Sequence, residues 1–156
     1  MSFITVEFPR PDIAVVSLNR PERMNAMAFD VMVPFREALE ELSFNNAVRV
    51  VIITGCGEGF CSGADLQDPG YLPIFDGLTM PGIARRAMRV LEDVITTIHN
   101  MHQPVIAAVN GAAIGGGFCL AMAADIRIAS DTAYFRPAGI NNGLTAAELG
   151  LSYILP

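Results

Sequence analysis

The stretch QPVIAAVNGAAIGGGFCLAMAADIRI, from Gln103 to Ile128, decides the fold expected of this chain. An apolar run, Val105 to Val109, is typical of a buried strand, and it leads through a glycine cluster into a short apolar helix, Phe118 to Ala123. This arrangement directs free backbone N–H groups and the positive end of the helix dipole to one point. Such a point suits an anion or a developing oxyanion. The alternative is that the glycines only let the helix pack closely on the sheet.

The rest of the chain alternates between strand and helix patterns, which predicts one α/β domain over residues 1–156. Pro34 should bend the first helix or delay its start. The segment Gln67 to Gly82, with three prolines and three glycines, is expected to be a long mobile loop. The expected elements are a hairpin of Phe3–Phe8 and Ile13–Leu18, strands at Val48–Ile53 and Ile126–Ala129, and helices at Phe29–Leu42, at Ile83–Met101 and near Thr145.

Composition limits the function classes. With 156 residues, 52% hydrophobic and 17% charged, the chain can bury the core of a globular domain. A net charge of −6 disfavours nucleic acid and anionic lipid as partners. No apolar run approaches the roughly 20 residues that a bilayer requires, and residues 1–10 carry no signal peptide, so a cytoplasmic protein is expected. The three cysteines lack CxxC spacing, so neither a disulfide framework nor a metal site is expected.

Common glycine and nucleophile motifs fit poorly. The cluster does not form GxGxxG, and Phe118 and Cys119 stand where a phosphate loop carries Lys and Ser or Thr. Ser62 lies one position too late for a GxSxG nucleophile elbow. Dinucleotide binding, ATP binding and serine hydrolysis are therefore disfavoured.

A second glycine segment, GCGEGFCSGADL from Gly55 to Leu66, follows a buried strand and by itself indicates only a turn. Combined with PVIAAVNGAAIGGG, however, it resembles the enoyl-CoA hydratase/isomerase (crotonase) family, whose two oxyanion-hole donors come from these two loops. NRPERMNA, Asn19 to Ala26, is similar to the family segment near the adenine and phosphates of CoA, and ADIRIAS, Ala124 to Ser130, is a fourth match. The resemblance covers essentially the whole chain in the expected order.

This resemblance implies a crotonase (ClpP/crotonase-like) spiral of ββα units that binds acyl-CoA thioesters as a lyase or isomerase of fatty acid metabolism, with no cofactor besides the CoA of its substrate. Family members usually assemble as trimers or dimers of trimers. They continue past Pro156 into helices that close the acyl pocket and build the trimer, so the chain is expected to be the N-terminal acyl-CoA-binding domain with its C-terminal helical part missing. The apolar face of Leu144, Leu149 and Leu151 should then lack cover and favour self-association.

The family's oxyanion donors map onto the backbone N–H groups of Ala64 and Gly116. An enolate places negative charge on the thioester oxygen, and losing one preorganised donor costs on the order of 10²–10³ in rate. Arg23 is either a contact for a CoA phosphate or a solvated surface arginine. Asp65 fits a turn cap better than a general base. The substrate-binding residues that the resemblance implies are Arg23, Met24, Ala26, Ser62, Ala64, Asp65, Leu66, Gly115 and Gly116.

The chain departs from the family at the two hydratase glutamates, whose places hold Cys119 and, depending on register, Gly139 or Ala138. Hydration needs groups that shuttle protons, so ordinary hydratase activity is not expected. Cys119 could be a thiolate, although a packed thiol fits better.

One acid lies nearby. Glu148, in GLTAAELG, resembles the catalytic aspartate of dienoyl-CoA isomerases with an offset of one residue, and it could move a proton between carbons of a bound enolate. It could also simply complement a helix dipole. Two other hypotheses remain open: a non-catalytic acyl-CoA-binding or assembly module, and a nucleotide-binding α/β domain.

Overall fold

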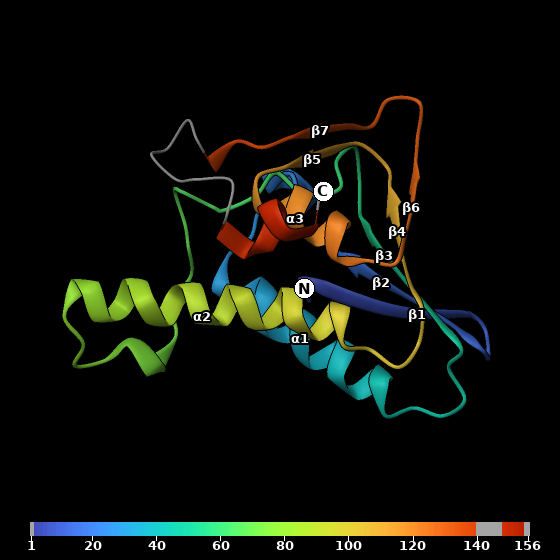
Figure 1. The fold of residues 1–156 in the computed structure, drawn as a ribbon, viewed down its shortest axis with the longest axis horizontal. Coiled ribbons are helices and arrows are strands. Elements are labelled where there is room, and N and C mark those ends of the chain that lie inside the picture. Colours follow the sequence, from blue (N-terminus) through green and yellow to red (C-terminus); the bar gives the residue numbers. More distant parts are fainter. Residues whose placement is uncertain (1, 140–147, 155–156) are drawn as a thin grey trace.

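A computed structural model of the protein describes residues 2–139 and 148–154, except for the side chain of Glu148. Its main sheet has the strand order β1-β2-β3-β4-β6 (Figure 1). β1 and β2 form the expected antiparallel hairpin, and every further neighbouring pair is parallel. The strands are β1 Ile4–Arg10, β2 Ile13–Leu18, β3 Val50–Gly55, β4 Val105–Val109 and β6 Ile126–Ala129.

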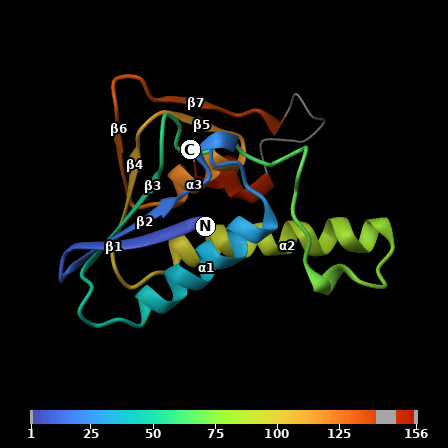
Figure 2. The same ribbon diagram turned by 180° about the vertical axis from the view of Figure 1, so that it is seen from behind.

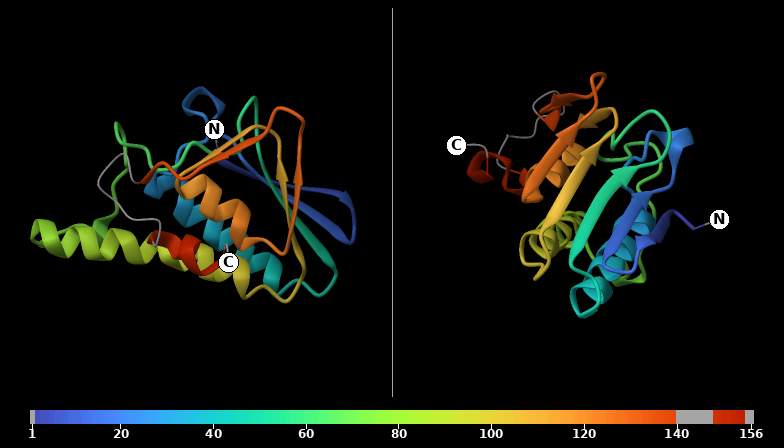
Figure 3. Two further views of the ribbon diagram at one scale, coloured as in Figure 1. Left: turned by 45° about the horizontal axis from the view of Figure 1, so that its top comes forward. Right: turned by 90° about the vertical axis from the view of Figure 1, so that its right-hand side faces the viewer.

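Three longer helices lie on one side of this sheet, where two of them, α1 and α3, pack on it and the other, α2, packs against α1 and α3 (Figure 2 and the right-hand view of Figure 3). They are α1 Phe29–Ser43, α2 Met80–His99 and α3 Gly116–Ala123; short helical segments are η1 Pro21–Arg23, η2 Pro73–Phe75, η4 Glu148–Gly150 and α4 Leu151–Ile154. None of the helices among the described residues has the length and apolar character needed to cross a membrane.

A second layer consists of much shorter parallel pairings. β5 Ala112–Ile114 pairs with β7 Tyr134–Arg136, and single bridges join Met27 to Ala64 and Cys61 to Ala113. Each turn of the chain therefore contributes a long strand, a short second-layer segment and a helix. This repetition is the expected spiral of ββα units. The sequence did not indicate β5 or β7, because three residues are too few to produce a periodic pattern.

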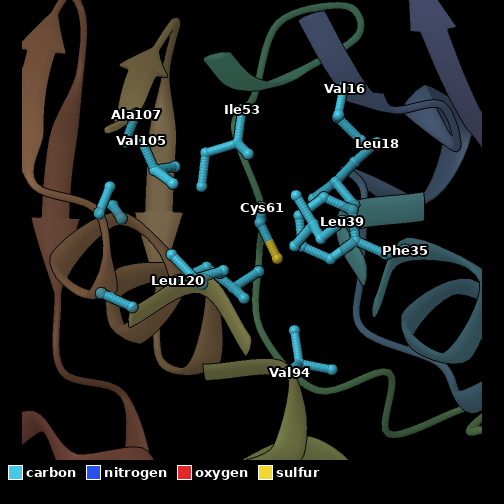
Figure 4. Close-up of a cluster of buried hydrophobic side chains, with 14 of the residues drawn as sticks. Val16, Leu18, Phe35, Leu39, Ile53, Cys61, Val94, Val105, Ala107 and Leu120 are labelled. Atoms are coloured by element: carbon cyan, nitrogen blue, oxygen red, sulfur yellow. The ribbon is translucent and has the colours of Figure 1, made fainter. Parts of the chain in front are cut away.

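The buried core lies between the main sheet and the helices (Figure 4). Phe35 and Leu39 of α1 face Leu120 of α3 across it, and the Cys61 side chain lies between them. Cys61 is fully buried, and its desolvation raises the pKa of the thiol to about 12. Cys61 therefore stays protonated and anchors the start of the following loop in the core.

Several boundaries differ from the predictions. α1 begins at Phe29 even though Pro34 lies within it, because burial of its apolar side chains outweighs one missing hydrogen bond. β3 begins at Val50 and includes Gly55, the residue expected to end it. α2 begins at Met80 with a proline in its first turn, so the expected loop ends at Thr79. α3 begins at Gly116, before Phe118. Thr145 lies outside the described residues.

The expected uncovered leucine face is wrong for Leu151, which is 4% exposed because α4 packs against α3. Leu149 packs partly against the same core, and Leu144 lies outside the described residues. Large apolar side chains are instead exposed on β6 and β7 at Ile126, Ile128, Tyr134 and Phe135.

Candidate functional site

Three segments that are distant in sequence meet beside the start of α3. Met27 N donates to Gly63 O at 2.7 Å, and Asp65 N donates to Met27 O at 3.1 Å. On its other side the same loop bonds to β5, where Cys61 N donates to Ala112 O at 3.0 Å and Ile114 N donates to Cys61 O at 2.9 Å. The loop of residues 61–65 is therefore held between the segment 24–27 and β5.

The orientation of the Ala64 N–H follows from this pairing. Gly63 O and Ala64 N belong to one planar trans peptide unit, so the carbonyl and the N–H point in opposite directions. Because the carbonyl bonds to Met27, the N–H points away from Met27. It has no hydrogen-bond acceptor among the residues that the structure describes. The peptide is thus held firmly while its donor stays available.

Gly116 places a second donor beside this loop. Its N–H is the first of α3, and it too has no acceptor within residues 2–139 and 148–154. A Cβ added to Gly63 would lie 3.3 Å from Gly116 N and 2.7 Å from Ile114 O, so the two loops touch at this point. Gly63 and Gly115 have φ values of +85° and +53°, which favour glycine at both positions.

The glycine cluster also serves packing, as the alternative interpretation of its glycines expected, whereas the oxyanion interpretation stays a prediction. A Cβ on Gly117 would collide with the backbone carbonyl of Cys61 and come within 2.7 Å of the Cys61 Cβ. Gly117 therefore permits close contact between α3 and the loop. A Cβ on Gly116 would meet Sδ of Met27, a flexible side chain.

Asp65 caps the turn that follows Ala64, as expected. Its Oδ1 accepts hydrogen bonds from Gln67 N at 3.0 Å and Asp68 N at 2.9 Å. The hydrogen bond from the Arg23 guanidinium, together with that from Asp68 N, lowers the pKa of the Asp65 carboxyl far below its usual value. Asp65 is therefore an ionised structural carboxylate, and its geometry does not fit a general base.

The other residues expected to bind substrate surround the same point. Arg23 binds Asp65 at 2.6 Å and Gln67 at 2.8 Å, and its side chain is 32% exposed, so it is a paired arginine and not a freely solvated one. Ser62 donates from Oγ to Arg23 O at 3.4 Å. Met24 and Leu66 are exposed, whereas Ala26 is buried. The structure brings these residues together, and their contact with a substrate stays a prediction.

The positions that matter for proton transfer lie around the start of α3. Cys119 is buried within the core, as expected for a packed thiol. A Cβ added to Gly115 would lie 3.9 Å from Ala138 Cβ, so the segment before Gly139 adjoins the glycine cluster. Glu148 begins η4, but its side chain lies outside the described part. The next residue, Leu149, packs at Gly116, with Cδ1 3.5 Å from a Cβ added there.

Sequence reasoning missed two asparagines that brace the loop after β3. The fully buried Asn25 donates to Cys56 O at 2.9 Å and Gly59 O at 2.8 Å, and it accepts from Arg20 N at 2.9 Å. Asn110 donates to Gly57 O at 2.9 Å. A signal was available, since asparagine often bonds to nearby backbone and tolerates the left-handed region, where Asn25 has φ 54°.

Replacing Asn25 with alanine is expected to destabilise the protein by about 2–4 kcal/mol, because the buried Arg20 N–H and the part-buried Cys56 carbonyl lose their side-chain partner and Gly59 O keeps the longer bond from Asn110 at 3.3 Å. Denaturant unfolding followed by circular dichroism measures this. Asn100→Ala, at an exposed position just after α2, is the matched control and should change stability by less than about 0.5 kcal/mol. Equal effects of the two variants would contradict the bracing role.

Comparison with known proteins identifies the fold and the family. The family model described as enoyl-CoA hydratase/isomerase matches residues 10–155. A probable enoyl-CoA hydratase of Mycobacterium bovis is 64% identical over the whole chain, which spans 55% of that relative's length. A crystal structure of a probable enoyl-CoA hydratase/isomerase from Mycobacterium abscessus has a TM-score of 0.93 at 64% identity, with the whole chain and 57% of that structure covered. A monofunctional enoyl-CoA isomerase from M. smegmatis has a TM-score of 0.79 at 54% identity, covering the whole chain and 62% of that structure. The chain belongs to the enoyl-CoA hydratase/isomerase family and has the α/β fold of crotonases.

Proposed function

We propose that this protein binds acyl-CoA thioesters and stabilises the enolate oxygen with the backbone N–H groups of Ala64 and Gly116. The observation that carries the proposal is that two firmly held loops touch beside two N–H groups with no acceptor among the described residues. Donors fixed in advance need no reorganisation when charge develops on the thioester oxygen. The positive end of the α3 dipole adds to the same effect.

The chemistry we propose is double-bond migration. A base removes a proton from a carbon beside the double bond, and the electron pair moves through the conjugated system onto the thioester oxygen. The protonated base then returns the proton to the other end, the electrons leave the oxygen, and the double bond has moved. One carboxylate is enough for this sequence. We assign it to Glu148, because the adjoining Leu149 packs at Gly116 and the hydratase positions hold Cys119 and Gly139 or Ala138. The M. smegmatis relative is described as an enoyl-CoA isomerase, which supports double-bond migration over hydration as the proposed chemistry.

A non-catalytic acyl-CoA-binding module is the competing function. The observation that favours it is the absence of a carboxylate at both hydratase positions. It predicts the same binding without turnover, so a product assay with several enoyl-CoA thioesters separates the two functions.

Acyl-CoA binding should raise the melting temperature. At a free concentration about 100-fold above Kd, a ligand stabilises the folded state by about 2.7 kcal/mol, which corresponds to roughly 5–10 °C for a chain of this size. Differential scanning fluorimetry with crotonyl-CoA, acetoacetyl-CoA, free CoA, NAD and ATP measures this. The proposal expects the thioesters to give the largest shifts. A shift with NAD or ATP and none with any CoA compound would favour the nucleotide-binding hypothesis instead.

The proposal extends to a cytoplasmic homo-oligomer, a trimer or hexamer. The apolar side chains exposed on β6 and β7 support self-association.

A further inference from the structure

A buried cluster of charges lies directly after the Ala64 donor. Asp65 Oδ2 is 3.2 Å from Nη1 of Arg20, and Asp65 Oδ1 is 2.6 Å from Nη2 of Arg23. Arg20 also reaches Asp68 at 3.2 Å. The cluster joins the segment of residues 20–25 to the loop of residues 62–68. Backbone hydrogen bonds, the Ser62 hydroxyl and the bond from Arg23 to Gln67 also connect these segments.

The burial of this cluster is unusual for charged side chains. The side chains of Asp65 and Arg20 are 2% and 8% exposed. A buried ion is tolerated where partners and hydrogen bonds compensate it, and removing one partner is costly. Arg20 is further fixed by the Phe3 ring, whose centroid is 5.4 Å from the guanidinium carbon. The geometry of Asp65 is therefore set from two arginines and from two backbone N–H groups.

These contacts fix both sides of the peptide that carries the Ala64 N–H. Before Ala64, the Gly63 carbonyl bonds to Met27 N; after it, Asp65 N bonds to Met27 O and the Asp65 side chain is locked by the cluster. A hydrogen-bond donor stabilises a developing oxyanion more strongly when it already points at the oxygen before the reaction begins. An unpaired carboxylate this close to the donor would also repel the oxyanion, and the two arginines offset that charge.

We propose that Asp65 is a positioning residue for thioester chemistry: held by Arg20 and Arg23, its carboxylate fixes the Ala64 N–H in the orientation that meets the thioester oxygen. This inference rests on the function proposed above. Asp65 does not touch the reacting atoms, and Arg23 acts here through Asp65.

The test compares acetoacetyl-CoA, whose acyl group forms a stable enolate, with free CoA, which has no thioester oxygen. Asp65→Asn keeps an oxygen for the turn and loses the charge that holds the arginines. We expect the preference for acetoacetyl-CoA over CoA, measured as a ratio of Kd values by titration calorimetry, to fall about tenfold. General destabilisation of the fold would weaken the binding of both ligands by the same factor and leave the ratio of Kd values unchanged. Asp12→Asn, which removes an exposed carboxylate paired with Arg10, is the matched control and should preserve the ratio.

A second variant guards against misfolding, because Asp65→Asn takes from the buried Arg20 its buried partner and leaves it the ion pair with the exposed Asp68. Arg20→Met/Asp65→Asn removes both charges and should fold, with the same loss of preference. A folded variant that keeps the wild-type ratio would overturn the positioning role. Failure of both variants to fold would assign the cluster to folding and also overturn it. Equal affinity of the unmodified protein for both ligands would instead refute the proposed function itself, and the inference with it.

Discussion

Replacing Gly116 with proline is expected to lower turnover of an enoyl-CoA thioester about 10²–10³-fold relative to Gly116→Ala, because proline removes the N–H that meets the oxyanion. Affinity for free CoA should stay within a few-fold in both variants. Steady-state kinetics together with a CoA titration measures the two effects separately.

Alanine is the necessary reference for this substitution. A Cβ at position 116 meets Sδ of Met27 whether alanine or proline supplies it, so both variants displace the same flexible side chain. Proline is tolerated in the first turn of a helix, and Gly116 is the first residue of α3. No described residue accepts a hydrogen bond from Gly116 N, so proline breaks no such bond within that part of the fold. The difference between the two variants therefore isolates the donor.

Equal activity of the alanine and proline variants would contradict a donor role for Gly116. If both variants lose activity and both lose their circular dichroism spectrum, the displaced Met27 side chain accounts for the loss through misfolding.

The sequence predicted elements whose own residues carry the signal. β2 and β4 coincide with their apolar runs, and α1 keeps its heptad-like spacing around Phe35 and Leu39 in spite of Pro34. The two glycine loops were recognisable because a close approach of backbones requires glycine, and Gly63 and Gly117 indeed lie where a side chain would collide with backbone.

The contacts that shape the site could not be predicted in the same way. The Arg20–Asp65 and Arg23–Asp65 bonds join residues separated by 45 and 42 positions, and their pairing depends on how the loops are brought together. The bridge between Cys61 and Ala113 is a single residue pair without any pattern of its own. Arg23 is an example. The sequence predicted either a contact with a CoA phosphate or a solvated side chain, and the ion pair with Asp65 became visible only in the structure.

Hydration and double-bond migration differ in the number of proton-transferring side chains that they require. The role of Glu148 therefore distinguishes a hydratase from an isomerase. Addition of water across the double bond needs a group that removes a proton from the water as its oxygen bonds to the β carbon, and a group that delivers a proton to the α carbon. The described neighbours of the proposed donors include Cys119, a buried thiol, and Ala138, which has no titratable group. Crotonyl-CoA hydration by this protein should therefore be very slow or absent, whereas migration of a double bond needs one carboxylate.

Glu148→Gln is expected to lower the conversion of a β,γ-enoyl-CoA to its α,β-isomer by about 10²-fold or more, because the amide keeps the shape of the side chain and loses its basicity. Affinity for the thioester should stay within a few-fold. The absorbance of the conjugated thioester follows the reaction, and Glu41→Gln, at an exposed position on α1, is the control that should keep full activity. Rapid hydration by the unmodified protein, or isomerisation by the Gln variant at the original rate, would refute the assignment. Inactivity of the unmodified protein towards all thioesters that it binds would leave Glu148 as a helix-terminus residue and support the binding module.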